Sequence, residues 1–302
     1  MCLHGKNAIK AYSKAWARSW QYGLCAVLAA LPPQTGFGYA RAMEQEGRAH
    51  ISVIIPVLGE GPGVNAVVDH LRSLAHGADL EIIVVDGEDR GDTLACLDRP
   101  GVLGITAPRG RAAQMNAGAA RACGRVLLFL HADTRLPETA LVALGRVLSC
   151  GLVRAGAFDL EFDSDRAGLS ALAWAARLRA RAERIPYGDR GVFVLADLFR
   201  DLGGFGDMPL MEDVDFFLRL RRSGEDVAIL TERARTSARR FEGAGIWTQA
   251  LRNLTLRLGF YLGLSPERLK AFYPDQPGAD TGGQGSGGQG ADGPGTDHSD
   301  HP

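Results

Sequence analysis

The chain has no large excess of charge of either sign. Its 34 lysine and arginine residues face 35 aspartate and glutamate residues, which gives a formal net charge of -1 at pH 7. A strongly basic surface is the usual electrostatic footprint of a nucleic-acid-binding protein. The balance therefore argues against a nucleic-acid partner, and any recognition of anions has to come from local clusters of cations.

Cysteine is scarce, and long apolar runs are missing. The five cysteines are scattered without a CxxC spacing, which argues against a disulfide framework or a zinc site and favours a reducing compartment. No run approaches the roughly 20 apolar residues of a membrane-spanning helix. The longest candidate, Tyr22 to Leu31, ends at Pro32. We therefore expect a cytoplasmic protein, with peripheral membrane contact left open.

The two ends of the chain differ from its middle. Residues 1–48 are predicted to be an N-terminal extension, poorly ordered or a short helix, in which lysines before an apolar run imitate a secretory signal. An alternative is that translation starts at Met43. Residues 275–302 are rich in Gly, Asp, Gln and Pro with almost no apolar side chain, which predicts a disordered tail. Residues 49–274 are the predicted folded domain.

Apolar, β-branched segments alternate with helical patterns through the first half of this domain. Strands are predicted at 51–56, 80–85, 102–106 and 126–130, with helices of about 10 to 15 residues between them. This alternation is typical of βαβ units and of a mostly parallel sheet with helices on both faces. The rhythm ends at Ala155 to Phe162, whose alternation predicts a half-exposed, antiparallel strand in a smaller part of the fold.

The most informative stretch runs from Pro108 to Thr134, with the sequence PRGRAAQMNAGAARACGRVLLFLHADT. Arg109 and Arg111 stand at the start of a predicted helix, whose unpaired N–H groups and dipole already favour an anion. Their guanidinium groups would add bidentate phosphate contacts. The next strand leads to His131 and Asp133, at the sheet edge where ligands of open α/β folds bind. The order predicts a site for a phosphorylated ligand.

Asp86 and Asp133 each follow an apolar strand, so a parallel sheet would bring both carboxylates to one crevice. A divalent ion held by one or two carboxylates and by phosphate oxygens would neutralise a diphosphate leaving group. Asp133 is the natural anchor. His131 is a candidate second ligand or ribose contact, and an imidazole shifts the preference from magnesium toward manganese. A strand-end histidine bonded to the backbone is the alternative.

The segment MEDVD, residues 211–215, opens another predicted helix after a Gly-Gly-Phe turn. Acidic residues in a first helical turn complement the dipole without any further function. In the functional interpretation, Asp213 is a general base that takes a proton from an attacking hydroxyl. Glu212 and Asp189 would line the acceptor side, although a plain turn at Asp189 is equally open.

Together these motifs resemble the family 2 glycosyltransferases of the GT-A fold. The likeness covers about His50 to Pro274. It is closest to a bacterial subgroup with the patterns PRGRAxQMNAGA, LLFLHADT, GGF and MEDVDF, labelled as an arsenosugar-biosynthesis-type glycosyltransferase. The resemblance implies a Rossmann-like α/β fold with a smaller antiparallel acceptor-side part. It also implies inverting transfer of a sugar from a nucleotide-diphosphate sugar, expected to be a UDP-sugar, to a small or lipid-linked hydroxyl acceptor.

The resemblance implies roles for individual residues. Those matched to the donor are Pro56, Glu60 and Asp86 at the base and ribose, Arg111 at a phosphate, and Asp133 at a divalent metal, Mn²⁺ or Mg²⁺. Asp213 matches the base of the ED motif. Arg240 also matches the subgroup and is a candidate clamp for the diphosphate, with a solvated basic edge as the alternative.

Two positions depart from the family pattern, and two other classes of function stay open. Gly59 stands where the family usually has Asn, and His131 replaces the first acid of the DxD motif.

A nucleotidyltransferase would also place arginines and metal carboxylates at strand ends, but the loop after the first strand lacks the lysine that is typical of this class. A non-catalytic module that binds nucleotide sugars or a membrane surface is favoured by arginines between 177 and 184 and by the apolar face of the predicted helix at 246–262.

Overall fold

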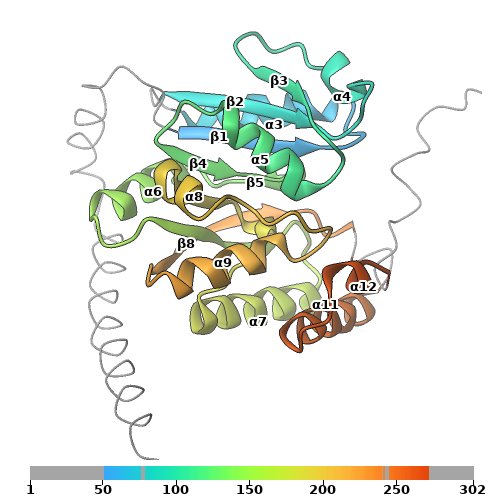
Figure 1. The fold of residues 1–302 in the computed structure, drawn as a ribbon. Coiled ribbons are helices and arrows are strands. Elements are labelled where there is room, and N and C mark those ends of the chain that lie inside the picture. Colours follow the sequence, from blue (N-terminus) through green and yellow to red (C-terminus); the bar gives the residue numbers. More distant parts are fainter. Residues whose placement is uncertain (1–50, 76–78, 240, 242–244, 272–302) are drawn as a thin grey trace, which may run out of the picture.

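The computed structural model describes residues 51–75, 79–239, 241 and 245–271. The predicted N-terminal extension and tail lie outside these residues, as does Arg240. Helices and strands alternate along the described chain (Figure 1). In chain order the elements are β1 (Ile51–Val57), α3 (Gly63–Leu74), β2 (Leu80–Asp86), α4 (Asp92–Ala95), β3 (Leu103–Thr106), α5 (Arg111–Arg121), β4 (Val126–Phe129), β5 (Thr134–Arg135), α6 (Ala140–Ser149), β6 (Ala155–Phe162), α7 (Ala167–Glu183), η3 (Gly188–Arg190), β7 (Val192–Leu195), α8 (Ala196–Asp201), α9 (Glu212–Arg222), β8 (Val227–Thr236), α11 (Ile246–Tyr261) and α12 (Pro266–Ala271).

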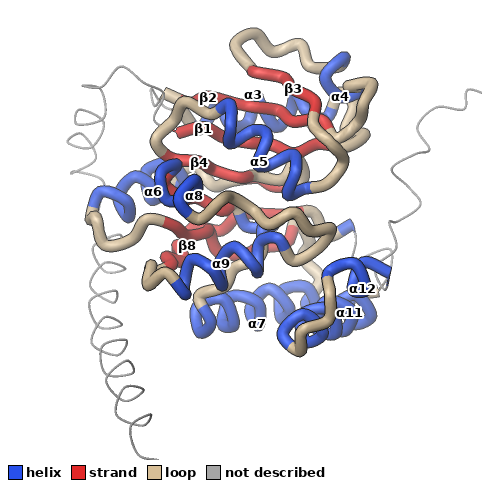
Figure 2. Tube along the Cα trace, viewed as in Figure 1, coloured by secondary structure: helices blue, strands red, loops and turns tan. Residues whose placement is uncertain are grey.

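The described strands form one eight-stranded sheet in the order β3-β2-β1-β4-β7-β6-β8-β5. Strands β3, β2, β1 and β4 run parallel, as the βαβ pattern predicts. Strand β7 is antiparallel to both of its neighbours, and β5 pairs antiparallel with β8. Helices lie to either side of the strands (Figure 2). The predicted α/β architecture, with its parallel part and its mixed part, is confirmed.

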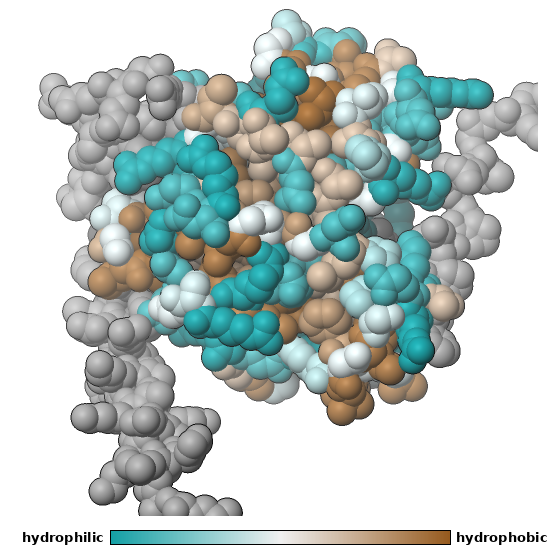
Figure 3. All heavy atoms as spheres, viewed as in Figure 1, coloured by the Kyte–Doolittle hydropathy of each residue, from teal (hydrophilic) through white to brown (hydrophobic). Residues whose placement is uncertain are grey.

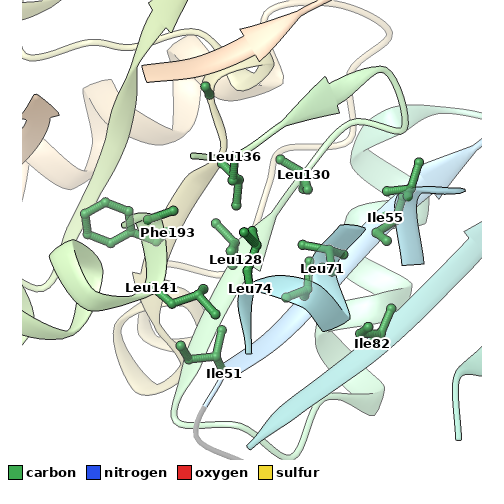
Figure 4. Packing of buried hydrophobic residues seen from close by; sticks show 14 of the residues in the cluster. Ile51, Ile55, Leu71, Leu74, Ile82, Leu128, Leu130, Leu136, Leu141 and Phe193 are labelled. Atoms are coloured by element: carbon green, nitrogen blue, oxygen red, sulfur yellow. The ribbon is translucent and has the colours of Figure 1, made fainter. Parts of the chain in front are cut away.

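The strands are buried because both of their faces carry apolar side chains. In β1, Val53 and Ile55 belong to one core cluster with the apolar residues of α3 and α6, whereas Ile54 belongs to another with residues of α5, α8 and α9. Figure 4 shows the first cluster closing around Leu128 and Leu71. This two-sided burial is why the parallel strands read as continuous apolar runs rather than as alternating ones.

Helix α5 packs unusually close to the sheet because its inward side includes Gly118. A Cβ atom at this position would lie 2.5 Å from Ile54 Cγ2 and 3.0 Å from Val85 Cγ2. The glycine therefore brings the N-terminus of α5 down onto the carboxyl ends of β1 and β2. The sequence predicts this helix to within one residue at each end.

The prediction of a half-exposed, antiparallel strand at Ala155 to Phe162 is wrong in two respects. Strand β6 has these bounds but is buried at every position except Glu161. It runs antiparallel to β7 and parallel to β8. The alternation misleads because Asp159 is buried in ion pairs with arginines, while α7 covers the apolar positions of the strand.

Four short elements were not expected from the sequence: α4, β5, α8 and α12. Each has six residues or fewer, too few for a periodic apolar pattern to emerge. Strand β8 is the longest described strand and runs from Val227 to Thr236. Its outer part alternates between exposed and buried residues because it lies near the edge of the sheet beside β5.

Candidate active site at the carboxyl edge of the sheet

Parallel pairing brings the ends of β1, β2 and β4 to one edge of the sheet. Val57 pairs with Asp86 at the end of β1 and β2. The chain leaves β4 through Leu130, whose N–H donates to the Ile54 carbonyl at 3.0 Å. His131 follows immediately. The structure therefore brings Asp86 and His131 to the same edge, as the strand pattern predicts.

The Asp86 carboxylate holds its own loop together. The side chain is 0% exposed, and its oxygens accept hydrogen bonds from the backbone N–H groups of Glu88 at 3.1 Å, Thr93 at 3.0 Å and Leu94 at 3.3 Å. Thr93 Oγ1 in turn accepts from the N–H of Glu60 at 3.2 Å. Asp86 thereby orders the first loop and α4, and its contact with a nucleotide stays a prediction. Pro56 lies half-buried within β1 beside it.

Gln114 on α5 ties the two strand ends together, a role the sequence analysis missed. Its Nε2 donates to the carbonyl of Val57 at 2.7 Å and to that of Val85 at 2.8 Å. Gly87 makes room for this amide, since a Cβ there would lie 2.9 Å from the Gln114 side chain. The available signal was an amide on the inward, otherwise apolar side of the predicted helix.

The N-terminus of α5 faces solvent with two arginines around it. Gly110 precedes the helix at φ 141°, and no described side chain caps the first turn. Arg109 and Arg111 are exposed. Free N–H groups and flanking guanidinium groups form the kind of anion site that the sequence predicts at this place.

The proposed base at the start of α9 lies beside His131 and Gly188. Asp213 Oδ2 accepts from the N–H of Gly188 at 2.5 Å, and its Oδ1 accepts from the N–H of Val214 at 2.7 Å. A Cβ added to Gly188 would lie 3.4 Å from Asp213 Oδ2 and 3.6 Å from His131 Nε2. The end of β4, the turn η3 and α9 thus converge at one point, and Gly188 leaves that point open.

The paired acids of α9 resist ionisation. Burial, together with the neighbouring Asp213 carboxylate, raises the pKa of Glu212 to about 7 against the opposing charge of Arg111. Burial also raises the pKa of Asp213, against the stabilising hydrogen bonds from Gly188 and Val214. Because Arg111 acts on both carboxyls, the cationic end of α5 faces the acids of α9. Both acids therefore bind a proton more readily than an exposed carboxylate does.

The Gly-Gly-Phe turn links α5 to α9. Asn116 Nδ2 donates to the Phe205 carbonyl, and Asn116 Oδ1 accepts from the Phe205 N–H, both at 2.9 Å. Arg219 on α9 donates to the carbonyls of Leu202 at 2.6 Å and Gly204 at 2.7 Å. The glycine at 204 is required, since a Cβ there would lie 2.7 Å from Asn116 Oδ1. The turn is therefore a fixed spacer between the two helices.

The donor groups for a metal are few. Asp133 is exposed in the turn after β4, and its carbonyl accepts from the Ser237 N–H at 3.2 Å. Among the described residues, no group of three or more His, Cys, Asp or Glu is arranged to hold an ion. A carboxylate with a nearby imidazole fits a Mg²⁺ or Mn²⁺ ion whose remaining ligands are phosphate oxygens and water.

A polar hollow of about 310 Å³ lies apart from this cluster, between β6, β8 and the start of α7. Its charged walls are largely satisfied. Glu161 pairs with Arg233 at 3.6 Å and with Arg235 at 3.4 Å, and Asp163 Oδ1 accepts from the Ala238 N–H at 2.7 Å. Because these charged groups already pair with one another, the hollow offers few unpaired groups for chemistry. The cluster of Asp213, Gly188 and His131 is therefore the better candidate for the reaction site.

Comparison with known proteins agrees with this geometry. Residues 52–145 match the family model described as glycosyl transferase family 2. No curated protein matches the chain. Among solved structures, S. aureus TarS 1–349 in complex with UDP-GlcNAc has 14% identity and a TM-score of 0.48, and the match covers 62% of this chain and 58% of that one. The chain thus spans somewhat over half of that TarS fragment.

Two solved structures align over more of the chain. A mannosyltransferase from Pyrobaculum calidifontis, in complex with GDP-Man and Mn²⁺, has 18% identity and a TM-score of 0.54, with 84% of this chain and 76% of that one covered. Glucosyl-3-phosphoglycerate synthase from Mycobacterium tuberculosis, in complex with Mg²⁺ and UDP, has 18% identity and a TM-score of 0.52, with 76% and 85% covered. The described chain has the GT-A fold of these two glycosyltransferases, and its residues 52–145 match the model of glycosyl transferase family 2.

Proposed function

We propose that the chain is an inverting glycosyltransferase that moves a sugar from a nucleotide-diphosphate sugar, expected to be a UDP-sugar, to a hydroxyl acceptor. The observation that carries the proposal is the carboxylate of Asp213, held by two backbone N–H groups beside His131 and facing Arg111. A base, an open reaction point and an anion site lie together there. The nucleotides bound by the aligned mannosyltransferase and synthase support a nucleotide-sugar donor.

The proposed reaction needs three tasks from this chain. Asp213 accepts the proton of the attacking hydroxyl while the oxygen forms its bond to the anomeric carbon. The bond from that carbon to the diphosphate oxygen breaks on the opposite face, so the configuration inverts and a nucleoside diphosphate leaves. Arg109, Arg111 and the free N–H groups of α5 stabilise the negative charge that develops on the leaving group.

A divalent ion would add charge neutralisation at the diphosphate. Asp133 would hold it, with His131 as the candidate second ligand. Both residues lie in the turn that follows β4, the strand after α5. The ions in the aligned complexes, Mn²⁺ and Mg²⁺, support this assignment. Arg240, the candidate diphosphate clamp, lies outside the described residues, and Asp189 follows Gly188 on the acceptor side.

Substitution of Asp213 tests the proposal. Asp213→Asn should lower sugar transfer by at least about a hundredfold because the proton acceptor is lost, while nucleotide affinity changes little. The measurement is release of nucleoside diphosphate from a panel of UDP- and GDP-sugars with an acceptor library. Asp201→Asn, an exposed acid at the end of α8, is the control and should keep full activity.

A binding measurement separates the donor site from the base. Thermal shifts with UDP or GDP and Mn²⁺ should raise the melting temperature of the wild type and of Asp213→Asn by mass action, but not that of Asp133→Ala. Full transfer by Asp213→Asn, or a normal Mn²⁺-dependent shift in Asp133→Ala, would contradict the assignment. No shift with any nucleotide would refute the donor class itself.

We further propose that residues 49–274 form the catalytic domain of a cytoplasmic bacterial enzyme of the arsenosugar-type subgroup. We also propose that this domain contacts a membrane surface peripherally. No described helix is both long and apolar enough to cross a bilayer. The outer sides of α7 and α11 nevertheless expose large apolar residues, and Figure 3 shows hydrophobic side chains gathered at the lower edge, where α11 and α12 lie in Figure 1. These residues are Trp174, Leu178, Trp247, Leu251, Leu254, Leu258, Tyr261 and Leu262. An apolar strip with tryptophans and nearby arginines suits an anionic lipid surface and a lipid-linked acceptor.

A further inference from the structure

Arg179 is a cation without an acidic partner among the described residues. It projects from the side of α7 that carries Ala176 and Glu183 at helical spacing. Its guanidinium carbon lies 4.2 Å from the centroid of the Tyr187 ring. Its Nε and Nη2 atoms are buried, and neither has a hydrogen-bond partner. A stacked guanidinium is thus held in place while two of its donor nitrogens stay unused.

The acids near Arg179 lie closest to other arginines, and among them Asp189 Oδ1 is 3.9 Å from Arg190 Nε. Asp159 pairs with Arg181 at 2.9 Å and lies 3.9 Å from Arg190, and Arg177 approaches it at 3.7 Å. Glu183 pairs with Arg257. This group of side chains from β6, α7, η3 and α11 therefore carries more cations than carboxylates.

The unused donors lie on the acceptor side of the reaction point. Tyr187 directly precedes Gly188, whose N–H binds the Asp213 carboxylate. Burial raises the pKa of Tyr187 to about 12, and the charges that act on it include Arg179, Asp213 and Asp189. Arg179 and the base therefore flank the same tyrosine from two elements, α7 and α9. The donor-side arginines come instead from the start of α5.

An unpaired buried donor is expensive for a folded protein. A buried polar group without a partner loses its hydrogen bonds to water and gains none in return, and the loss is larger when the group is charged. Asp159 on β6 and Glu183 on α7 show that the surrounding elements can supply carboxylates to arginines where only structure is required. The fixed guanidinium of Arg179, with two donor nitrogens unused, is therefore the arrangement expected of a binding site for an anionic ligand.

We propose that Arg179, stacked on Tyr187, is a subsite for an anionic group of the acceptor, a carboxylate or a phosphate. The inference rests on the proposed transferase function and narrows it. The acceptor is then a hydroxyl compound that carries a negative charge a short distance from the hydroxyl facing Asp213. Arg179 fixes this charge, and the fixed charge orients the hydroxyl toward the base.

Replacement of Arg179 by a neutral residue of similar length tests the subsite. In the full chain, Arg179→Met should weaken inhibition of transfer by inorganic phosphate and by a simple carboxylate such as acetate at least about tenfold, because a charge-assisted hydrogen bond is lost. The variant should have a higher KM for the charged acceptors glycerate and glycerol 3-phosphate. Its KM and kcat for the neutral acceptor glycerol should change little. Whichever charged acceptor loses more identifies the source as carboxylate or phosphate.

The control is Arg166→Met at the exposed start of the same helix, which should behave as wild type. The melting temperature of Arg179→Met should be unchanged or higher, because an unpaired cation is removed. A lower melting temperature with unchanged anion inhibition would make Arg179 a structural residue and overturn the inference. Nucleotide-dependent thermal shifts are the independent check, since their absence in the wild type would refute the transferase function rather than this subsite.

Discussion

At the residue scale, the buried acid Glu212 makes the stability of the folded protein depend on pH. Its side chain is 7% exposed, and its pKa of about 7 lies above the ordinary value near 4.5. The folded protein therefore binds this proton more tightly than the unfolded chain does. The resulting stability is fully present below about pH 4.5 and is lost as the pH rises through 7.

We expect Glu212→Gln to remove this dependence. The free energy of unfolding of the wild type should fall by about 2 to 3 kcal/mol between pH 5 and pH 8, whereas that of the variant should be flatter over the same range. Urea denaturation at several pH values measures the difference. Glu138→Gln, at an exposed acid outside the cluster, is the control and should follow the wild-type curve. Parallel curves for wild type and Glu212→Gln would contradict the role given to burial.

Sequence and structure agree least at single polar side chains. The sequence places Asp86 at a strand end, but three N–H groups of its own loop engage its carboxylate. The roles of Gln114 and Arg179 could not be predicted from the sequence, because each role depends on the groups that a neighbouring element places opposite the side chain. Spacing along one chain reports which face a residue occupies, and it does not report what the neighbouring element presents there.

At the element scale, helix α5 is defined by its glycine as much as by its apolar residues. Gly118→Ala should destabilise the protein by about 1 to 3 kcal/mol, because the new methyl group overlaps Ile54 Cγ2 at 2.5 Å and forces the helix away from the sheet. The shift should also weaken nucleotide affinity, since Gln114 and the first turn of α5 move with it. Chemical denaturation and thermal shift with UDP measure the two effects.

A matched substitution is available at the start of α3. A Cβ at Gly63 would meet nothing within 4 Å, so Gly63→Ala should be neutral or slightly stabilising. If both glycine variants had the same stability as the wild type, the close approach of α5 to the sheet would not depend on Gly118.

Long elements were predictable, and their partners were not. Helix α9 begins at Glu212, where the acidic segment 211–215 predicts the start of a helix. Strand β6 was located correctly, but its burial depends on α7, whose arginines neutralise Asp159. The residue pattern of one strand does not show whether a helix that follows later in the chain covers that strand. Nor does it show which strands pair with it, so the pairing of β6 with β7 and β8 is known only from the structure.

At the scale of the whole molecule, the apolar strip on α7 and α11 predicts association with anionic vesicles. The full chain should float with vesicles of phosphatidylcholine and phosphatidylserine, and less so at high salt, because the nearby arginines contribute electrostatically. Trp247→Ser with Leu251→Ser should reduce the floated fraction severalfold, since both side chains are more than half exposed.

The control uses an apolar residue elsewhere on the surface. Leu152 is 50% exposed in the turn between α6 and β6, and Leu152→Ser should leave flotation unchanged. Equal flotation of all variants would show that the strip does not contact lipid, and the transferase assignment would stand without it.

The link between Asn116 and Phe205 has a consequence for how such chains can be recombined. Asn116 lies on α5 and Phe205 in the turn before α9, and the Asn116 amide both donates to and accepts from the Phe205 backbone. A chimera that joined the first half of this chain to the second half of a relative would fold with a well-placed reaction centre only if the relative offered the same turn. Exchange of the first half alone would therefore remove both of these hydrogen bonds and, with them, the fixed spacing between α5 and α9.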